Sequence, residues 1–325
     1  MDPYAIFDPI DAATFDAHAL AQFQFHYQNN TVYRQFCAHL KRTENHVKNV
    51  CDIPFLPIEF FKSKTIVSNS QKPQVLFTSS GTTGSTTSTH YVTDIGLYER
   101  SYLEAFQYFY GPASDYCILA LLPSYLEREG SSLIYMVQDL IQKSSHPDSG
   151  FYLHDVDALQ QKILKLEALG TKTLLIGVSF ALLDLVEKFR FNLKYTTVME
   201  TGGMKGKRKE MIRTALHERL REGFGVEVIH SEYGMTELLS QAYSKGHGIF
   251  ETPPWMRIYI RDTEDPLTYQ AHGKTGGVNI IDLANHNSCP FIATQDLGKC
   301  YKNGHFEILG RFDHSDIRGC NLMAL

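Results

Sequence analysis

The sequence lacks paired metal-binding cysteines, zinc-protease histidines and any excess of positive charge. Its six cysteines show no C-x-x-C spacing, so we expect reduced thiols rather than a disulfide framework or a metal cage. The 14 histidines include no H-E-x-x-H element, which excludes the common metalloprotease pattern. A formal net charge of -5 gives no electrostatic basis for binding nucleic acid.

Long apolar runs and a secretion signal are also missing. The N-terminus, Met1–Tyr4, lacks the basic and apolar regions of a signal peptide. Apolar runs such as Tyr116–Pro123 are far shorter than a membrane span. With 43% hydrophobic and 21% charged residues, the composition is that of a globular protein, which we expect to be cytoplasmic and to have no membrane span.

The most informative segment that is present consists of glycine and hydroxyl side chains, Thr78–Thr89. It follows the apolar run Val75–Phe77, which predicts the end of a buried strand, and the apolar pattern resumes at Tyr91. Glycines let several backbone N–H groups converge and hydroxyls add donors, which suits a triphosphate. The lysine of the nucleoside-triphosphatase P-loop is absent, because Ser85 and Thr86 stand in its place. A flexible Ser/Thr linker is the alternative.

A second segment combines an aromatic ring, a glycine, a hydroxyl and a carboxylate. Val226–Ile229 predicts a short buried strand that leads directly into Ser231–Glu237. Ligands of open α/β sheets bind at such strand ends. Tyr233 can offer a flat face to a purine, Thr236 can donate to a phosphate oxygen, and Glu237 can hold Mg²⁺.

Together, Thr78–Gly84 and Tyr233–Glu237 resemble the paired signature of adenylate-forming enzymes, the superfamily of acyl-CoA synthetases, luciferases and peptide-synthetase adenylation domains. Thr201-Gly202-Gly203 resembles the adenine-side glycine turn of that superfamily. Thr294–Gly298 resembles its T-G-D-L-G element, with Gln295 in place of a glycine, and Gly310–Asp313 resembles its G-R-x-D element.

The resemblance implies ATP and Mg²⁺ as cofactors, with Asp296 on the ribose hydroxyls. The nucleotide-binding residues that it implies are Thr78, Ser79, Ser80, Gly81, Thr82, Thr83, Gly84, Gly202, Gly203, Tyr233, Gly234, Met235, Asp296 and Arg311. The catalytic residues that it implies at the phosphate end are Thr236 and Glu237, and Glu237 is also the expected Mg²⁺ ligand.

The C-terminal segment narrows the resemblance. Adenylate-forming enzymes continue past G-R-x-D into a small lid domain with a catalytic lysine, whereas this sequence ends at Leu325 and its last lysine is Lys302. We therefore expect the mobile lid to be absent. Ser315–Leu322, together with Ile53–Pro57, is similar to the acyl-protein synthetases of bacterial bioluminescence operons. That family resemblance implies Cys320 as a catalytic residue that carries the acyl group.

The chain length between Arg311 and Cys320 permits this role. Nine residue steps span at most about 30 Å. A thiolate is a strong nucleophile, and its thioester remains activated for transfer. An inert cysteine in a frayed tail is the alternative. Arg318 and the basic cluster 205–209 are candidates for replacing the charge of the lid lysine.

The resemblance implies ATP-dependent activation of a carboxylic acid, a medium- or long-chain fatty acid, as an acyl-adenylate. The acyl group would pass to Cys320 and then to a partner such as an acyl reductase or an acyl-carrier protein. Two other interpretations stay open: a truncated acyl-CoA ligase that uses free coenzyme A, and a non-catalytic nucleotide-binding relative.

A rival motif, Gly177–Ala181, nearly matches the G-x-S-x-G elbow of serine hydrolases, with Ala181 in place of the last glycine. Asp282 and His305 could be nominated as its partners. We favour the interpretation as a strand-to-helix turn beside the carboxylate-substrate pocket.

Alternating strand and helix patterns predict an α/β fold, the large N-terminal domain of the adenylate-forming superfamily. We expect one domain, 1–325, with α/β units over about 1–245, a β-rich sublobe over 246–312 and a tail over 313–325. Predicted strands are Val75–Phe77, Tyr116–Leu122, Thr173–Ile176, Thr197–Met199, Val226–Ile229, Met256–Ile260, Gly277–Ile281 and His305–Leu309. Predicted helices are two within Pro9–Leu40, joined at Asn29-Asn30, and Leu97–Tyr110, Ser131–Lys143, Val156–Leu169 and Lys209–Glu222.

Overall fold

The structure is a computed structural model that describes residues 2–68, 71–79, 87–123, 130–202 and 211–312. The chain forms two compact units. Unit 1 comprises Met1–Ser101, Thr236–Ser240 and Glu251–Leu325, and unit 2 comprises Tyr102–Met235 and Gln241–Phe250. Within the described ranges, no helix combines the length and apolar character needed to cross a membrane.

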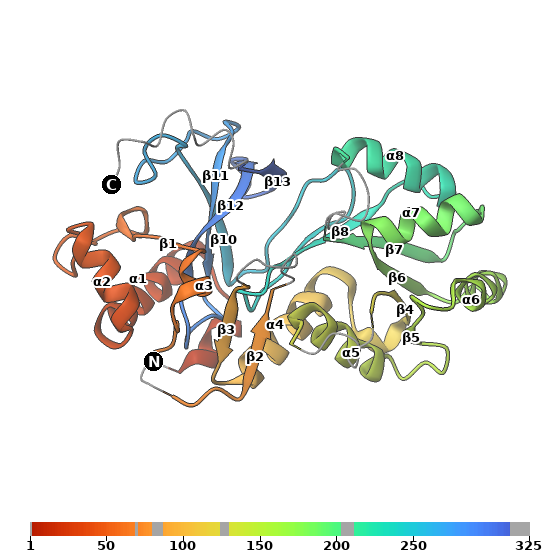
Figure 1. The fold of residues 1–325 in the computed structure, drawn as a ribbon, viewed down its shortest axis with the longest axis horizontal. Helices are drawn as coiled ribbons and strands as arrows, with labels where there is room; N and C mark the ends of the chain where they lie inside the picture. Colours follow the sequence, from red (N-terminus) through yellow and green to blue (C-terminus); the bar gives the residue numbers. More distant parts are fainter. Residues whose placement is uncertain (1, 69–70, 80–86, 124–129, 203–210, 313–325) are drawn as a thin grey trace. The chain divides into compact units, whose positions relative to one another are not determined.

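Unit 2 is built on a six-stranded sheet in the order β5-β4-β6-β7-β8-β9, parallel except for β9 (Figure 1). Its strands are β4 (Cys117–Leu121), β5 (Gly150–Phe151), β6 (Thr173–Val178), β7 (Thr196–Thr201), β8 (His230–Tyr233) and β9 (Ala242–Ser244). Its helices are η3 (Ala113–Asp115), α5 (Ser132–Ser144), α6 (Val156–Ala168), α7 (Ser179–Lys188) and α8 (Arg213–Phe224). This alternation confirms the predicted α/β class.

Helices cover both faces of this sheet, which is why the central strands β4 and β6 are buried at every residue. Leu174 and Ile176 of β6 line a small apolar cavity with Met136 of α5. Gly177 lies on the opposite face, where an added Cβ atom would come within 2.9 Å of Leu182 in α7. Alternate residues of β6 therefore face α5 on one side of the sheet and α7 on the other, and Figure 1 shows these two helices on opposite sides of β6.

The prediction of a strand at Val226–Ile229 was wrong. The strand is β8, His230–Tyr233, and it pairs with β7 from Met199↔His230 onward. Val226 and Val228 are only half-buried and Glu227 is exposed, whereas Ser231, Glu232 and Tyr233 are buried. Polar residues occupy the buried strand because hydrogen bonds satisfy them there, a feature that an apolar pattern cannot reveal.

Unit 1 contains a five-stranded sheet in the order β1-β12-β11-β10, with β13 paired to β12. Its strands are β1 (Leu56–Pro57), β10 (Met256–Arg261), β11 (Gly276–Asp282), β12 (Phe291–Cys300) and β13 (Phe306–Arg311), and a separate hairpin consists of β2 (Val75–Thr78) and β3 (Thr89–Val92). Its helical segments are η1 (Pro3–Phe7), α1 (Ala12–Asn29), α2 (Thr31–His39), η2 (Val50–Asp52) and α3 (Phe60–Ser63). Helix α4, Ile95–Tyr110, begins in unit 1 and ends in unit 2.

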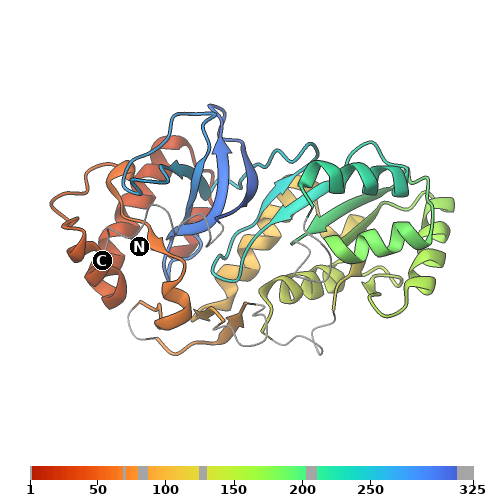
Figure 2. The ribbon, with the colours of Figure 1, turned by 45° about the horizontal axis from the view of Figure 1, so that its top comes forward.

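The two N-terminal helices confirm the prediction for Pro9–Leu40, including the turn at Asn29-Asn30. Asn30 caps α2 by accepting a hydrogen bond from the Tyr33 N–H. Its side-chain amide donates to the Ser288 carbonyl at 2.8 Å, and Gln22 of α1 donates to the Leu283 carbonyl at 2.8 Å. These bonds fix α1 and α2 beside the sheet, whose twisted blue strands are seen in Figure 2.

The β-rich segment after residue 245 matches three predicted strands, now β10, β11 and β13. The ten-residue strand β12 was not predicted, because its second half carries the polar T-Q-D-L-G element. The prediction of a buried strand before the hydroxyl-rich loop was wrong in one respect. Strand β2 forms with β3 a two-stranded hairpin in which Phe77 is buried but Leu76 is 48% exposed.

Candidate functional site

Hairpin β2–β3 in unit 1 holds both ends of the hydroxyl-rich loop. The Ser79 N–H donates to the Ser88 carbonyl at 3.0 Å, and the Ser88 N–H donates to Ser79 Oγ at 2.9 Å. Thr78 pairs with Thr89 in the ladder. The predicted binding residues Ser80, Gly81, Thr82, Thr83 and Gly84 lie outside the described residues.

Glu237, the last residue of the second motif, is buried in unit 1, at 4% exposed. Burial raises the pKa of its carboxyl, although a hydrogen bond from Ser88 and the charges of Arg311 and Lys62 act in the opposite direction. The favourable contacts of the Glu237 carboxylate offset only part of the cost of burying its charge, so a bound cation would stabilise the charged form. Glu237 therefore fits the role of the predicted Mg²⁺ ligand.

The main chain around Thr236 and Glu237 is held by buried side chains that the sequence did not single out for this role. His90 of β3 contacts the Thr236 carbonyl through Nδ1 at 2.8 Å, and Asn285 Nδ2 donates to the Glu237 carbonyl at 2.7 Å. Further along, the Asp282 carboxylate accepts from the N–H groups of Leu239 at 2.8 Å and Ser240 at 3.0 Å. Backbone groups on both sides of Glu237 are therefore fixed.

The predicted ribose-side residues of unit 1 come together. Asp296 and Arg311 are cross-strand partners in β12 and β13, and Arg311 Nε lies 3.3 Å from Asp296 Oδ1. Asp296 is mostly buried, whereas Arg311 is 70% exposed, so the ion pair itself stabilises the fold little. Arg261 donates to the carbonyls of Val278 and Thr294 and thereby supports the start of this element.

In unit 2, Gly202 follows β7 with a φ of +68°, a conformation that favours glycine. Tyr233 ends β8, and its ring packs edge-on against Phe250 with the centroids 5.9 Å apart. A Cβ atom on Gly234 would lie 2.5 Å from Glu232 Oε1, so glycine keeps space for that carboxylate. Met235 is half-buried and is the last residue before the chain enters unit 1. Gly203 lies outside the described residues.

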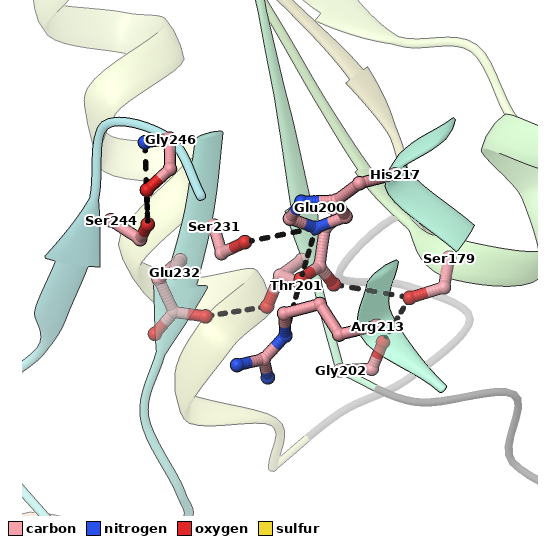
Figure 3. Close-up of polar contacts among 10 residues, drawn as sticks. All are labelled: Ser179, Glu200, Thr201, Gly202, Arg213, His217, Ser231, Glu232, Ser244 and Gly246. Carbon is pink, nitrogen blue, oxygen red and sulfur yellow. Dashed lines mark hydrogen bonds and ion pairs between the residues drawn. The ribbon is translucent and has the colours of Figure 1, made fainter. Parts of the chain in front are cut away.

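A buried carboxylate, Glu200, forms the centre of a polar network beside Gly202 (Figure 3). It is 5% exposed and accepts a hydrogen bond from Ser179 at 3.1 Å. His217 Nε2 lies 3.5 Å and Arg213 Nε 3.7 Å from its other oxygen. Burial alone would raise the pKa of Glu200, but the His217 hydrogen bond, the charge of Arg213 and a hydrogen bond from Ser231 outweigh it and lower the pKa. Glu200 is therefore a buried anion.

A neighbouring contact in the same unit joins two motif segments, since the Thr201 hydroxyl donates to the Glu232 carboxylate (Figure 3). Strands β7 and β8 pair here through Thr201↔Glu232. Sequence reasoning missed Glu200, Glu232, His217 and Arg213. A signal was present, because Glu200 ends an apolar strand and Arg213 and His217 are four apart on one helix face.

The serine hydrolase interpretation is not supported. Ser179 begins α7 directly after β6, as a strand-to-helix turn requires, but its hydroxyl donates to Glu200 and to the Gly202 carbonyl at 2.5 Å. Asp282 is engaged by backbone N–H groups, and His305 Nε2 lies 3.8 Å from Glu251. The nominated triad residues therefore have other partners.

Three predictions fall on residues that the structure does not describe. They are the acyl carrier Cys320, Arg318 and the basic cluster 205–209. Among the described residues, the cysteines are free thiols. Also within those ranges, no three His, Cys, Asp or Glu side chains are grouped as a ready metal site.

The fold is that of adenylate-forming enzymes. An open conformation of 2-hydroxyisobutyryl-CoA ligase aligns with 95% of this chain and 77% of its own, at 12% identity and a TM-score of 0.65. ATP-bound MatB from Rhodopseudomonas palustris aligns with 73% of this chain at 18% identity and a TM-score of 0.53. This chain covers 47% of the MatB chain.

Family membership is more specific. Residues 1–324 match the family described as acyl-protein synthetase, LuxE, and the chain belongs to that family. The long-chain-fatty-acid–luciferin-component ligase of Vibrio harveyi is 44% identical over 63 residues, which are 19% of this chain and 16% of that protein. The family expected from the sequence is thus confirmed.

Proposed function

We propose that this protein activates a fatty carboxylic acid with ATP and then carries the acyl group on Cys320. The observation that carries the proposal lies in unit 1, where His90, on the strand that follows the hydroxyl-rich loop, contacts the Thr236 carbonyl through Nδ1 at 2.8 Å. The strand after the first half of the predicted signature and the end of its second half, far apart in the sequence, are therefore neighbours. Family membership and the named fatty-acid ligase support the choice of substrate class.

In the first step a carboxylate oxygen of the acid attacks the α-phosphorus of ATP. A C–O–P bond forms, the bond from the α-phosphorus to the bridging oxygen breaks, and pyrophosphate leaves. Thr236 would donate to a phosphate oxygen, and Glu237 would hold Mg²⁺, whose charge would offset that of the phosphates. Thr78, Ser79 and the following glycines bind the phosphates, Gly202 and Tyr233 the adenine, and Asp296 with Arg311 the ribose.

In the second step the thiolate of Cys320 attacks the carbonyl carbon of the acyl-adenylate. A C–S bond forms, the bond to the phosphate oxygen breaks, and AMP leaves, while the thiol proton passes to solvent. The thioester would then be used by a partner, an acyl reductase or an acyl-carrier protein, in the cytoplasm.

Carboxylate-dependent exchange of pyrophosphate into ATP tests the first step. Loss of one donor to developing charge costs about 10²–10³ in rate, so Thr236→Ala and Glu237→Gln should each lose that much. Thr263→Ala and Glu264→Gln are matched controls, because this exposed threonine–glutamate pair lies in a turn of unit 1. Near-normal exchange in both Thr236→Ala and Glu237→Gln would refute the assignment.

Labelling tests the second step. Labelled acid, ATP and Mg²⁺ without coenzyme A should leave hydroxylamine-sensitive label on the wild type but not on Cys320→Ala, which should keep pyrophosphate exchange. An absence of protein-bound label in this reaction, with labelled acyl-CoA formed once coenzyme A is added, would favour the coenzyme A ligase instead. A wild type without carboxylate-dependent exchange would favour the non-catalytic relative.

A further inference from the structure

Two buried side chains outside the predicted motifs hold the backbone carbonyls of Thr236 and Glu237. His90 Nδ1 lies 2.8 Å from the Thr236 carbonyl, and Asn285 Nδ2 donates to the Glu237 carbonyl at 2.7 Å. His90 Nε2 and Asn285 Oδ1 are 3.1 Å apart, so the two side chains also contact each other. We name this arrangement the His90–Asn285 clasp.

The protonation of the clasp follows from its partners. A carbonyl only accepts hydrogen bonds, so Nδ1 of His90 must carry a proton. Burial lowers the pKa of His90 to about 4, against the hydrogen bonds to Thr236 and Asn285, and the ring is neutral near pH 7. Nε2 then carries no proton, so its 3.1 Å contact with Asn285 Oδ1 joins two acceptors and is not a hydrogen bond in the neutral ring; the Asn285 amide is held by its bond to the Glu237 carbonyl. Of the two contacts of the His90 ring, the hydrogen bond to the Thr236 carbonyl is therefore the stronger.

Nothing in the predicted chemistry uses His90 directly. Its ring is fully buried, and the edge of Phe61 packs against it at 90° with the centroids 5.7 Å apart. Asn285 is likewise fully buried. Two buried polar side chains from distant parts of the sequence thus act on two consecutive carbonyls, at the residues that carry the proposed chemistry.

We propose that His90 and Asn285 are positioning residues for adenylation, an inference that rests on the proposed function. They fix the carbonyls of Thr236 and Glu237 and thereby the directions of the hydroxyl and the carboxylate. On the C-terminal side, Asp282 already anchors Leu239 and Ser240. The clasp is what anchors the reacting end of the segment, where a misplacement of about 1 Å can cost about 10²-fold in rate.

The amides of asparagine and glutamine separate the two contacts of His90. In His90→Asn the amide nitrogen lies near the position of Nδ1 and can still donate to the Thr236 carbonyl. In His90→Gln it lies near the position of Nε2, so only the contact with Asn285 is kept. His90→Leu removes both. His26→Leu is the matched control, because His26 is also fully buried in unit 1 but contacts Ser68 instead.

Pyrophosphate exchange should fall by about 10- to 100-fold in kcat for His90→Leu and His90→Gln, with the KM for ATP changed less than about threefold. His90→Asn should recover to within about threefold of the wild type, although it loses ring volume. His26→Leu should keep the wild-type kcat per folded molecule. Equal loss in His90→Asn and His90→Leu, or an unchanged kcat in His90→Leu, would overturn the positioning role.

Hydrogen exchange of the backbone amides in 236–240 tests the clasp without any activity. These amides should exchange faster in His90→Leu than in the wild type or in His26→Leu, because local opening becomes easier. Unchanged protection in His90→Leu would overturn the clasp. A wild type that lacks pyrophosphate exchange would refute the proposed function alone and leave this measurement to decide on the clasp.

Discussion

Replacing one buried histidine should make unit 1 less sensitive to acid. His26 in α1 is completely buried, and burial, followed by the nearby His286, lowers its pKa from the ordinary 6.5 to about 3. Below pH 6.5 the unfolded chain therefore binds a proton at His26 that the folded protein does not bind. The contribution of His26 to the free energy of unfolding is fully present above pH 6.5 and is lost as the pH falls from 6.5 towards 3.

The size of the effect follows from the two pKa values. At pH 5 the unfolded ring binds about 0.97 proton and the folded ring about 0.01, which costs about 2 kcal/mol relative to pH 8. His90 and His286, with pKa values lowered by burial to about 4, add about 2 kcal/mol each at that pH. The sum, about 6 kcal/mol, is comparable with the whole stability of a domain.

His26→Asn removes one of these protons and keeps an amide near the position of Nδ1, beside Ser68. As the pH is lowered near 5, the free energy of unfolding decreases in both proteins. The slope, in kcal/mol per pH unit, should be smaller in the variant than in the wild type by about 1.3. Urea unfolding at pH 8, 6.5, 5.5 and 5 measures this slope, and the single tryptophan, Trp255, reports on unit 1. Phe23→Leu is the control, since it removes buried apolar volume but no titrating group. A His26→Asn slope equal to that of the wild type would refute the argument.

Two further substitutions test packing and polar contacts. Gly223→Ala in α8 would place a Cβ atom 2.3 Å from Val186 Cβ in α7, and overpacking should destabilise unit 2 by about 1–3 kcal/mol in urea unfolding followed by circular dichroism; an unchanged midpoint would contradict the close packing of these helices. Asp282→Asn replaces one acceptor oxygen of the carboxylate by a donor NH₂ group, which leaves some of the backbone N–H groups around it without an acceptor. The free energy of unfolding should decrease by about 3 kcal/mol, measured by urea unfolding followed by tryptophan fluorescence. Wild-type stability would show that this carboxylate does not anchor the segment.

Helix positions were predictable because apolar spacing and capping agreed. The predicted Val156–Leu169 is α6, Val156–Ala168, where Asp155 accepts from the Ala158 N–H. Ser131 likewise caps α5 through the Ile134 N–H. Local chemistry determined these boundaries, and the structure confirms them to within about two residues, the ordinary uncertainty of helix ends.

Strands were less predictable wherever function placed polar residues in them. Strand β8 contains His230, Ser231 and Glu232, and β12 contains Gln295 and Asp296. Their backbone hydrogen bonds go to neighbouring strands and not to residues within the same segment, so no local apolar pattern marks them. The motifs themselves were recognised, but Ser231–Glu237 was placed after a strand that in fact includes its first residues, and no strand was predicted at Thr294–Gly298.

The supporting residues of the candidate site were hidden for a related reason. Glu200 ends an apolar run and looks like the exposed end of a strand, and His90 follows a run of hydroxyl residues and looks like part of a loop. Each becomes informative only when its partner is known: Ser179 and His217 for Glu200, and Thr236 for His90. A buried polar side chain requires a hydrogen-bond partner, and for His90 that partner, Thr236, belongs to a motif. Residues that hold a motif in place can thus be identified from the structure by asking which buried polar groups lead to it.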